Sequence, residues 1–155
     1  MHRIRVYVDT SVFGGTMDEE FAEASNRFFE RVQNVEFVVL PCTETLRELA
    51  KAPDPVRGVW KALPPQLVEE LAISAEAANL AREYINANVL DPASESDALH
   101  VAVATVAGAD LILSWNFKHI VNFNRIKGFN SVNANQGYRP MTILSPIEVI
   151  YNGED

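Results

Sequence analysis

The amino-acid sequence predicts an α/β fold, with a central and mainly parallel sheet of four to five strands flanked by helices, in one domain over residues 1–155. Short apolar, β-branched runs alternate with longer segments of helical periodicity, which is typical of βαβ units. A chain of 155 residues with 48% hydrophobic residues can bury about two thirds of its unfolded surface. We therefore expect a single core, without linkers or internal repeats.

The strands that we expect are short and mostly buried on both faces. A fifth, weaker candidate contains acidic residues, which suit only an edge or an irregular strand. The expected ranges are 4–8, 36–40, 110–114 and 141–144, with 67–73 as the weaker candidate.

Helical spacing of apolar residues predicts the covering helices. Ser74 is the expected N-cap of one helix, and Gly108 is the expected end of another. Ser94 and Asp97 have the spacing of a capping box before the last helix. The expected ranges are 18–33, 43–52, 55–63, 74–88 and 98–108.

The formal net charge of −8 at first argues against a polyanionic partner, but the charges are unevenly distributed. Residues 1–110 carry 18 acids against nine Lys and Arg, whereas residues 111–147 carry four bases and no acid. This basic strip consists of Lys118, Arg125, Lys127 and Arg139. Acids that hold a divalent cation, beside a strip that holds a phosphate backbone, would fit this distribution.

The single cysteine, Cys42, excludes an internal disulfide, and no apolar run approaches the roughly 20 residues that a membrane span needs. The first residues lead into a strand without the apolar region of a signal peptide. We therefore expect a cytoplasmic protein without a membrane partner.

The first strand ends in a carboxylate, Asp9, which is followed by Thr10, Ser11 and an expected turn at Gly14 and Gly15. The carboxyl ends of the strands in open α/β sheets form the crevice where ligands bind, so this position suits chemistry. The alternative is that Asp9 only caps a turn.

Further oxygen ligands are expected at the same crevice. Glu48, with Glu44 one turn before it, lies on the helix 43–52, Asp97 opens the last helix, and Asn116 follows the strand 110–114. Mg²⁺ prefers oxygen ligands and typically takes one or two carboxylates, several waters and phosphate. Carboxylates at about 4 Å repel by about 4 kcal/mol per pair, so such a cluster would be costly without a metal. For each acid alone, a capping role or a solvated helix face is the alternative.

The chain resembles the PIN domains of VapC-type toxins in four ordered segments, VDTSVFGG, TETLRELAKAPDP, SESDALHVAVAT and ADLILSWNFKHIVN, and in the tail NANQGYRPMTILSP. The resemblance covers nearly the whole chain and implies a three-layer PIN-like fold. It also implies an endoribonuclease that cuts single-stranded RNA and depends on Mg²⁺ or Mn²⁺. Such proteins usually pair with a small antitoxin protein in a type II toxin-antitoxin system, and are often homodimers.

Transferred to this sequence, the resemblance implies that Asp9, Glu48 and Asp97 bind the metal, with Glu44 as another candidate for the second acid. Asn116 occupies a fourth catalytic position that is often Asp in the family, and a neutral amide binds a cation less firmly than a carboxylate. A metal held by these acids would lower the pKa of a bound water and orient it toward a phosphodiester.

Neighbouring polar residues are expected to support this site. Thr10 and Ser11 would hydrogen-bond a carboxylate or a phosphate, and Ser114 would support Asn116. We expect His100 to pack or hydrogen-bond near the site rather than to bind the metal. The expected RNA contacts are Lys118, His119, Arg125, Lys127 and Arg139.

Phe117, Phe123 and Phe129 alternate with the basic residues, as in single-strand sites where bases stack and phosphates pair. The same spacing also suits the core of a helix, which is the more common reason for it.

Two other functions are compatible with the sequence. One is a PIN-like domain without catalysis that binds a partner, which Asn116 in the fourth position would allow. The other is a haloacid-dehalogenase-like phosphatase, which also has an Asp after its first strand but needs a second acid two residues later, where this chain has Ser11.

Overall fold

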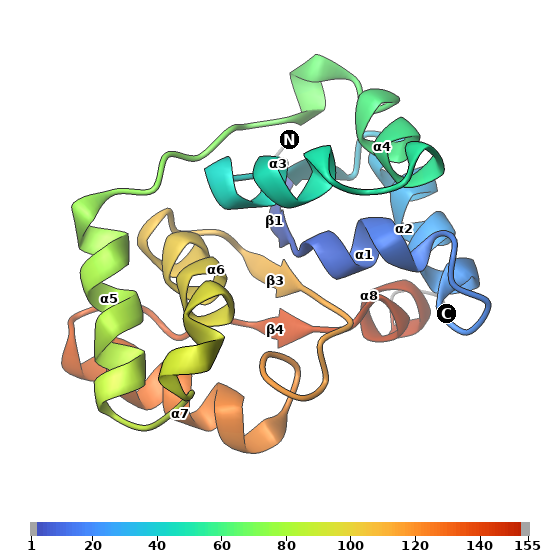
Figure 1. The fold of residues 1–155 in the computed structure, drawn as a ribbon. Helices are drawn as coiled ribbons and strands as arrows, with labels where there is room; N and C mark the ends of the chain where they lie inside the picture. Colours follow the sequence, from blue (N-terminus) through green and yellow to red (C-terminus); the bar gives the residue numbers. More distant parts are fainter. Residues whose placement is uncertain (1–2, 153–155) are drawn as a thin grey trace.

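The computed structural model describes residues 3–152, which form a parallel sheet between two sets of helices (Figure 1). Over these residues the sheet has four strands in the order β2-β1-β3-β4, and every pair is parallel. The strands are β1 (Ile4–Val8), β2 (Phe37–Val39), β3 (Leu111–Leu113) and β4 (Ile143–Leu144). The predicted α/β class and parallel sheet are confirmed.

The register brings the carboxyl ends of the two central strands together. Val6 of β1 lies opposite Val39 of β2, and Val8 of β1 lies opposite Leu113 of β3. Asp9 and Ser114 are therefore the first residues beyond β1 and β3 at the same edge of the sheet.

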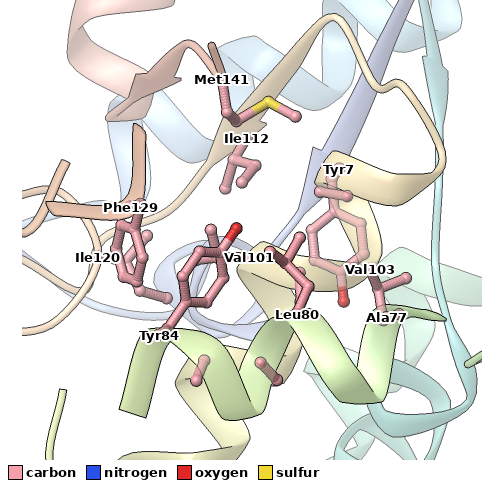
Figure 2. Packing of buried hydrophobic residues seen from close by; sticks show 14 of the residues in the cluster. Tyr7, Ala77, Leu80, Tyr84, Val101, Val103, Ile112, Ile120, Phe129 and Met141 are labelled. Atoms are coloured by element: carbon pink, nitrogen blue, oxygen red, sulfur yellow. The ribbon is translucent and has the colours of Figure 1, made fainter. Parts of the chain in front are cut away.

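One face of the sheet is covered by α5 (Ala75–Asn86), α6 (Glu95–Val106) and α7 (Phe123–Asn135). Figure 2 shows Tyr7 and Ile112 of the sheet among the side chains of these helices, including Leu80, Tyr84 and Phe129. The Tyr84 and Phe129 rings meet edge to face, with centroids 5.0 Å apart. Tyr7 thus carries its hydroxyl into this side of the core.

The opposite face holds a second core. Val6 and Val8 of β1 and Leu111 and Leu113 of β3 point into it, as alternation along a strand requires. The covering helices are α1 (Thr10–Gly15), α2 (Ala22–Gln33), α4 (Asp54–Lys61) and α8 (Pro146–Asn152), and α3 (Thr43–Ala50) follows β2. None of the helices in residues 3–152 is long and apolar enough to cross a membrane.

Two predicted caps are confirmed and one is wrong. The hydroxyl of Ser74 accepts a hydrogen bond from the backbone N–H of Ala77, and Gly108 ends α6 with a φ of +69°. Ser94, however, makes no side-chain capping bond, because a short 3₁₀ helix (Pro92–Ser94) runs directly into α6. Asp97 is therefore not a capping-box partner.

The expected turn at Gly14 and Gly15 is wrong, since both glycines lie in α1. Burial of Val12 and Phe13 against the second core outweighs the low helix propensity of glycine. The helix expected over 18–33 begins only at Ala22.

The weak strand candidate at 67–73 is not a strand of the sheet. A 3₁₀ helix (Pro65–Leu67) occupies its start, and only isolated parallel bridges, from Val68 to Val39 and from Leu71 to Cys42, follow. Exposed Glu69 and Glu70 interrupt the apolar pattern between these bridges.

Candidate active site

An open cleft of about 440 Å³ lies at the carboxyl edge of the sheet. Four acids line it. Three are the predicted metal ligands, Asp9 after β1, Glu48 of α3 and Asp97 in the first turn of α6, and the fourth is Asp18. The other lining residues are Thr10, Ser11, Gly14, Gly15, Phe21, Trp115 and Asn116. The cleft thus combines an acidic side with apolar and glycine residues.

Two serines hold the carboxylate of Asp9, which is only 7% exposed. The hydroxyls of Ser11 and Ser114 each donate to its Oδ2 at 2.8 Å. Ser114 also accepts the backbone N–H of Asn116 at 2.9 Å, and Ser11 accepts the backbone N–H of Trp115 at 2.9 Å. These bonds fix one oxygen of Asp9 and tie it to the loop after β3.

A buried histidine holds the carboxylate of Glu48. Nε2 of His100, on α6, donates to Oε1 of Glu48 at 2.6 Å, and Nδ1 of His100 lies 2.6 Å from the hydroxyl of Tyr7. The Tyr7 hydroxyl also lies 3.1 Å from Sγ of Cys42. A buried chain of polar groups therefore runs from β1 to the edge of the cleft.

The environment of this chain favours a charged imidazole. Burial alone lowers the pKa of His100, but hydrogen bonding with Cys42 and Glu48, together with the charges of Asp9 and Glu48, outweighs burial and raises the pKa to about 10. For the thiol of Cys42, burial has the opposite effect and raises the pKa. Hydrogen bonds from His100, Tyr7 and Thr45 outweigh burial and lower the pKa of Cys42 to about 7. At neutral pH the imidazolium and Glu48 therefore form an ion pair.

Asp97 is held by a second histidine. Nδ1 of His119 lies 2.8 Å from Oδ2 of Asp97, and both side chains are about one quarter exposed. The backbone N–H of His119 donates to Oδ1 of Asn116 at 3.0 Å. The amide oxygen of Asn116 therefore stabilises its own loop, although the side chain lines the cleft.

The hydrogen bonds of the three acids share a pattern within residues 3–152: each carboxylate is held through one oxygen, and its other oxygen accepts no hydrogen bond from the chain. Oγ1 of Thr10, which also lines the cleft, is buried and has no hydrogen-bond partner among the described residues. Buried polar atoms are rarely left in this way, and a ligand or ordered water usually accounts for them.

The chemistry of a metal site here is that of carboxylate oxygens, which Mg²⁺ prefers as ligands. Among residues 3–152, no group of three or more His, Cys, Asp or Glu side chains is gathered closely enough to form a ready-made metal centre. Mg²⁺ usually keeps several waters and binds through one or two carboxylates, and outer hydrogen bonds of the kind seen here orient such ligands. The ligand type of these residues therefore fits Mg²⁺, while their spacing in residues 3–152 does not form a complete metal centre.

Other predicted site residues lie outside the cleft lining. Glu44 pairs with Arg47, with 2.9 Å between Oε2 and Nη1. Arg139 lies beside Gly108, which precedes β3, and so is at the amino edge of the sheet, away from the cleft. The two do not join the acids.

The remaining basic residues divide into two groups. Lys118 is exposed and follows the cleft residue Asn116 by two positions. Arg125 and Lys127 lie on α7, where Lys127 is exposed and the guanidinium of Arg125 donates to the backbone carbonyl of Val89. The structure therefore does not gather the basic strip into one patch around the acids.

Several cleft residues have no clear signal in the sequence. Asp18 and Phe21 reach the cleft because α2 begins later than its apolar spacing suggests, and Trp115 reaches it through the loop after β3. Tyr7 contacts His100 across 93 positions of sequence, so only the fold brings them together.

The comparisons with known proteins support the fold. No protein-family model matches the chain, and no curated protein matches it. Among solved structures, a chain of VapBC2 from Rickettsia felis, bound to a DNA fragment from their promoter, is similar with a TM-score of 0.59 and 12% identity. The match covers 92% of this chain and 98% of that chain. At this identity the likeness shows the fold alone, and the predicted PIN-like arrangement of a parallel sheet between helices is confirmed.

Proposed function

We propose that this protein is a metal-dependent endoribonuclease that cleaves single-stranded RNA. The observation that carries the proposal is that Asp9, Glu48 and Asp97, from three elements far apart in the sequence, line one cleft at the carboxyl edge of a PIN-like sheet. Ligand sites of open parallel sheets lie at this edge. Hydrolysis of a phosphodiester is the chemistry that a carboxylate-bound Mg²⁺ or Mn²⁺ serves well.

We assign the cation to the free oxygens of the three acids. When bound, it would lower the pKa of a coordinated water and neutralise charge on the phosphate. Neighbouring side chains hold these acids in place. Ser11 and Ser114 hold Asp9. His100 holds Glu48, and His119 holds Asp97. Each acid is thus oriented before any ligand arrives.

We assign the nearest RNA phosphate contacts to Lys118 and His119, which follow Asn116 at the cleft. Lys127 and Arg125 on α7 would contact phosphates of the RNA strand further from the cleft. Arg139 is left out of this assignment because it lies at the opposite edge of the sheet.

The proposal extends to the biological setting. The similar structure is a VapBC2 complex, so we propose that this chain is the toxin of a type II pair and binds a small antitoxin protein. A homodimer and a cytoplasmic location belong to the same proposal.

The test is cleavage of a labelled single-stranded RNA with Mg²⁺, with Mn²⁺ and with EDTA. The parent protein should cut only with a metal, Asp9→Asn should lose most of this activity, and Asp54→Asn should keep it because Asp54 is an exposed acid on α4. Activity that survives EDTA, or that Asp9→Asn does not reduce, would contradict the proposal. A folded protein that binds a small partner but cuts no RNA with either metal would be a partner-binding domain instead.

The phosphatase alternative has less support. A haloacid-dehalogenase-like enzyme needs a second acid two residues after Asp9, and here the hydroxyl of Ser11 at that position donates to Asp9.

A further inference from the structure

Three aromatic residues, Phe21, Trp115 and Phe117, form a cluster at the cleft, which we call the aromatic wall. Phe21 and Trp115 line the cleft, and their rings stack with centroids 4.1 Å apart and planes at 20°. Trp115 is only 6% exposed, so it supports the other two rings from behind. Phe117 lies against both rings, with centroids 6.4 Å from Phe21 and 6.1 Å from Trp115, and is 47% exposed. Single exposed apolar residues are common on proteins, but a cluster of rings beside a polar cleft indicates a binding surface.

The wall is held rigidly. The indole Nε1–H of Trp115 donates to the hydroxyl of Ser25 at 2.8 Å. A Cβ at Gly15 would lie 2.6 Å from Oγ of Ser25 and 2.7 Å from Nε1 of Trp115, so only glycine leaves room for this contact. The orientation of the indole is therefore fixed by α1 and α2 together.

The position of the wall relative to the acids is also fixed. The hydroxyl of Ser11 accepts the backbone N–H of Trp115 at 2.9 Å and donates to Oδ2 of Asp9 at 2.8 Å. One side chain thus connects the wall to the acid that follows β1. A ligand that contacts both would meet them at a set spacing.

The cleft is open where α1 borders it. Gly14 lines the cleft, and a Cβ built on it would meet no atom within 4 Å. A larger side chain at this position would therefore project into free space of the cleft.

We propose that the aromatic wall binds one unpaired nucleobase of the RNA, next to the phosphate at the acidic side of the cleft. This inference rests on the proposed function, because it is the cation proposed for the acids that would attract the phosphate of an RNA strand. A nucleobase is flat, stacks on aromatic side chains whatever its sequence, and is joined to a phosphate. Duplex RNA would keep its bases stacked inside the helix, so the wall selects single strands.

The test measures binding rather than cleavage. Trp60 and Trp115 are the two tryptophans of the chain, so a Trp60→Phe background reports on Trp115 alone. Two short 2′-O-methyl oligonucleotides serve as probes, one of uridines and one with the same backbone but no bases, each checked by gel to remain intact. The uridine probe should quench Trp115 and bind about tenfold more tightly than the abasic probe.

Variants separate the wall from the rest of the cleft. Phe117→Ala and Gly14→Leu should each weaken binding of the uridine probe about tenfold, to the affinity of the abasic probe. Neither variant should change the affinity for the abasic probe. Gly58→Leu is the matched control, because Gly58 is also an open helical glycine but lies on α4. Phe117 is half exposed, so its variant remains informative even if Gly14→Leu folds poorly.

The results distinguish this inference from the proposed function. Equal binding of the two probes, or no binding of either, would contradict the proposal that the aromatic wall binds a nucleobase. RNA cleavage by the same protein would then still support the nuclease function. Base-dependent binding without cleavage in Mg²⁺ or Mn²⁺ supports the wall and contradicts the nuclease.

Discussion

Nε2 of His100 lies 2.6 Å from Oε1 of Glu48, and this contact joins a buried ring to a carboxylate at the cleft. The side chain of His100 is 2% exposed, whereas that of Glu48 is 37% exposed. An exposed glutamate would ordinarily sample several rotamers, so the ring limits the positions of Glu48. The ring is itself held at Nδ1 by the hydroxyl of Tyr7.

Tyr7→Phe should lower the free energy of unfolding by about 1–3 kcal/mol, because it removes the hydroxyl that lies 2.6 Å from Nδ1 of the buried His100. Urea unfolding followed by circular dichroism measures this change. Tyr151→Phe is the control, since Tyr151 is 42% exposed and its hydroxyl makes a long bond of 3.4 Å to Glu23, and it should change stability little. Equal stability of the parent and Tyr7→Phe would show that the hydroxyl does not hold the ring.

Neighbouring glycines of α1 should respond in opposite ways to alanine. Gly14→Ala should stabilise the protein by up to about 1 kcal/mol, because its Cβ meets nothing and alanine favours a helix. Gly15→Ala should destabilise it by about 1–3 kcal/mol, because its Cβ would push Ser25 and Trp115 apart. Urea unfolding of both variants tests the pair, and the opposite order of stability would refute the packing at Gly15.

Alkaline pH should unfold the protein through its buried tyrosines. Burial raises the pKa of Tyr84 above its usual value of 10.0, and burial raises the pKa of Tyr7 well above it. A folded pKa above the unfolded one means that the stabilisation is complete below pH 10 and is lost as the pH rises beyond it. Tyrosinate absorbance at 295 nm from these two groups should therefore appear together with loss of circular dichroism, and ionisation of all four tyrosines in a still folded protein would contradict this.

Much of the fold could be predicted because the strands are buried on both faces and their apolar runs are continuous. The helix α1 could not, since its two glycines disfavour a helix, and the burial of Val12 and Phe13 that stabilises it depends on the fold. The helix α7 was not predicted, although Asn122 caps it by accepting the N–H groups of Asn124 and Arg125. The asparagines at positions 124, 130, 133 and 135 have low helix propensity and make the apolar spacing of this helix hard to recognise.

The site could be predicted as far as the parallel sheet alone determines it. Asp9 and Asn116 follow adjacent strands, and parallel strands bring such positions to one edge. The partners of the acids could not be predicted, because the contacts of His100 with Glu48 and of His119 with Asp97 depend on which side chains face each other across the packed elements. The basic strip was predicted from charge alone, and the fold separates Arg139 from the cleft.

Asp97→Asn should separate a metal ligand from a structural acid. Asp97 does not cap α6 and is partly exposed, so the metal-free variant should unfold within about 1 kcal/mol of the parent. The rise in melting temperature that Mg²⁺ gives the parent by mass action should largely disappear in the variant. The metal-ligand role would be contradicted if the variant melted at a lower temperature than the parent without metal and Mg²⁺ raised its melting temperature as much as that of the parent. Asp97 would then be a structural residue.

The central claim, that three acids of one cleft hold one divalent cation, is tested most directly by titrating Mn²⁺ into the protein and counting bound ions by electron paramagnetic resonance. The account predicts that the parent and Asp54→Asn bind Mn²⁺ with the same affinity. Asp9→Asn, Glu48→Gln and Asp97→Asn should each weaken binding by about tenfold or more, as expected when a charged ligand is lost. A parent that binds no Mn²⁺, or binding that none of the three substitutions changes, would contradict the account.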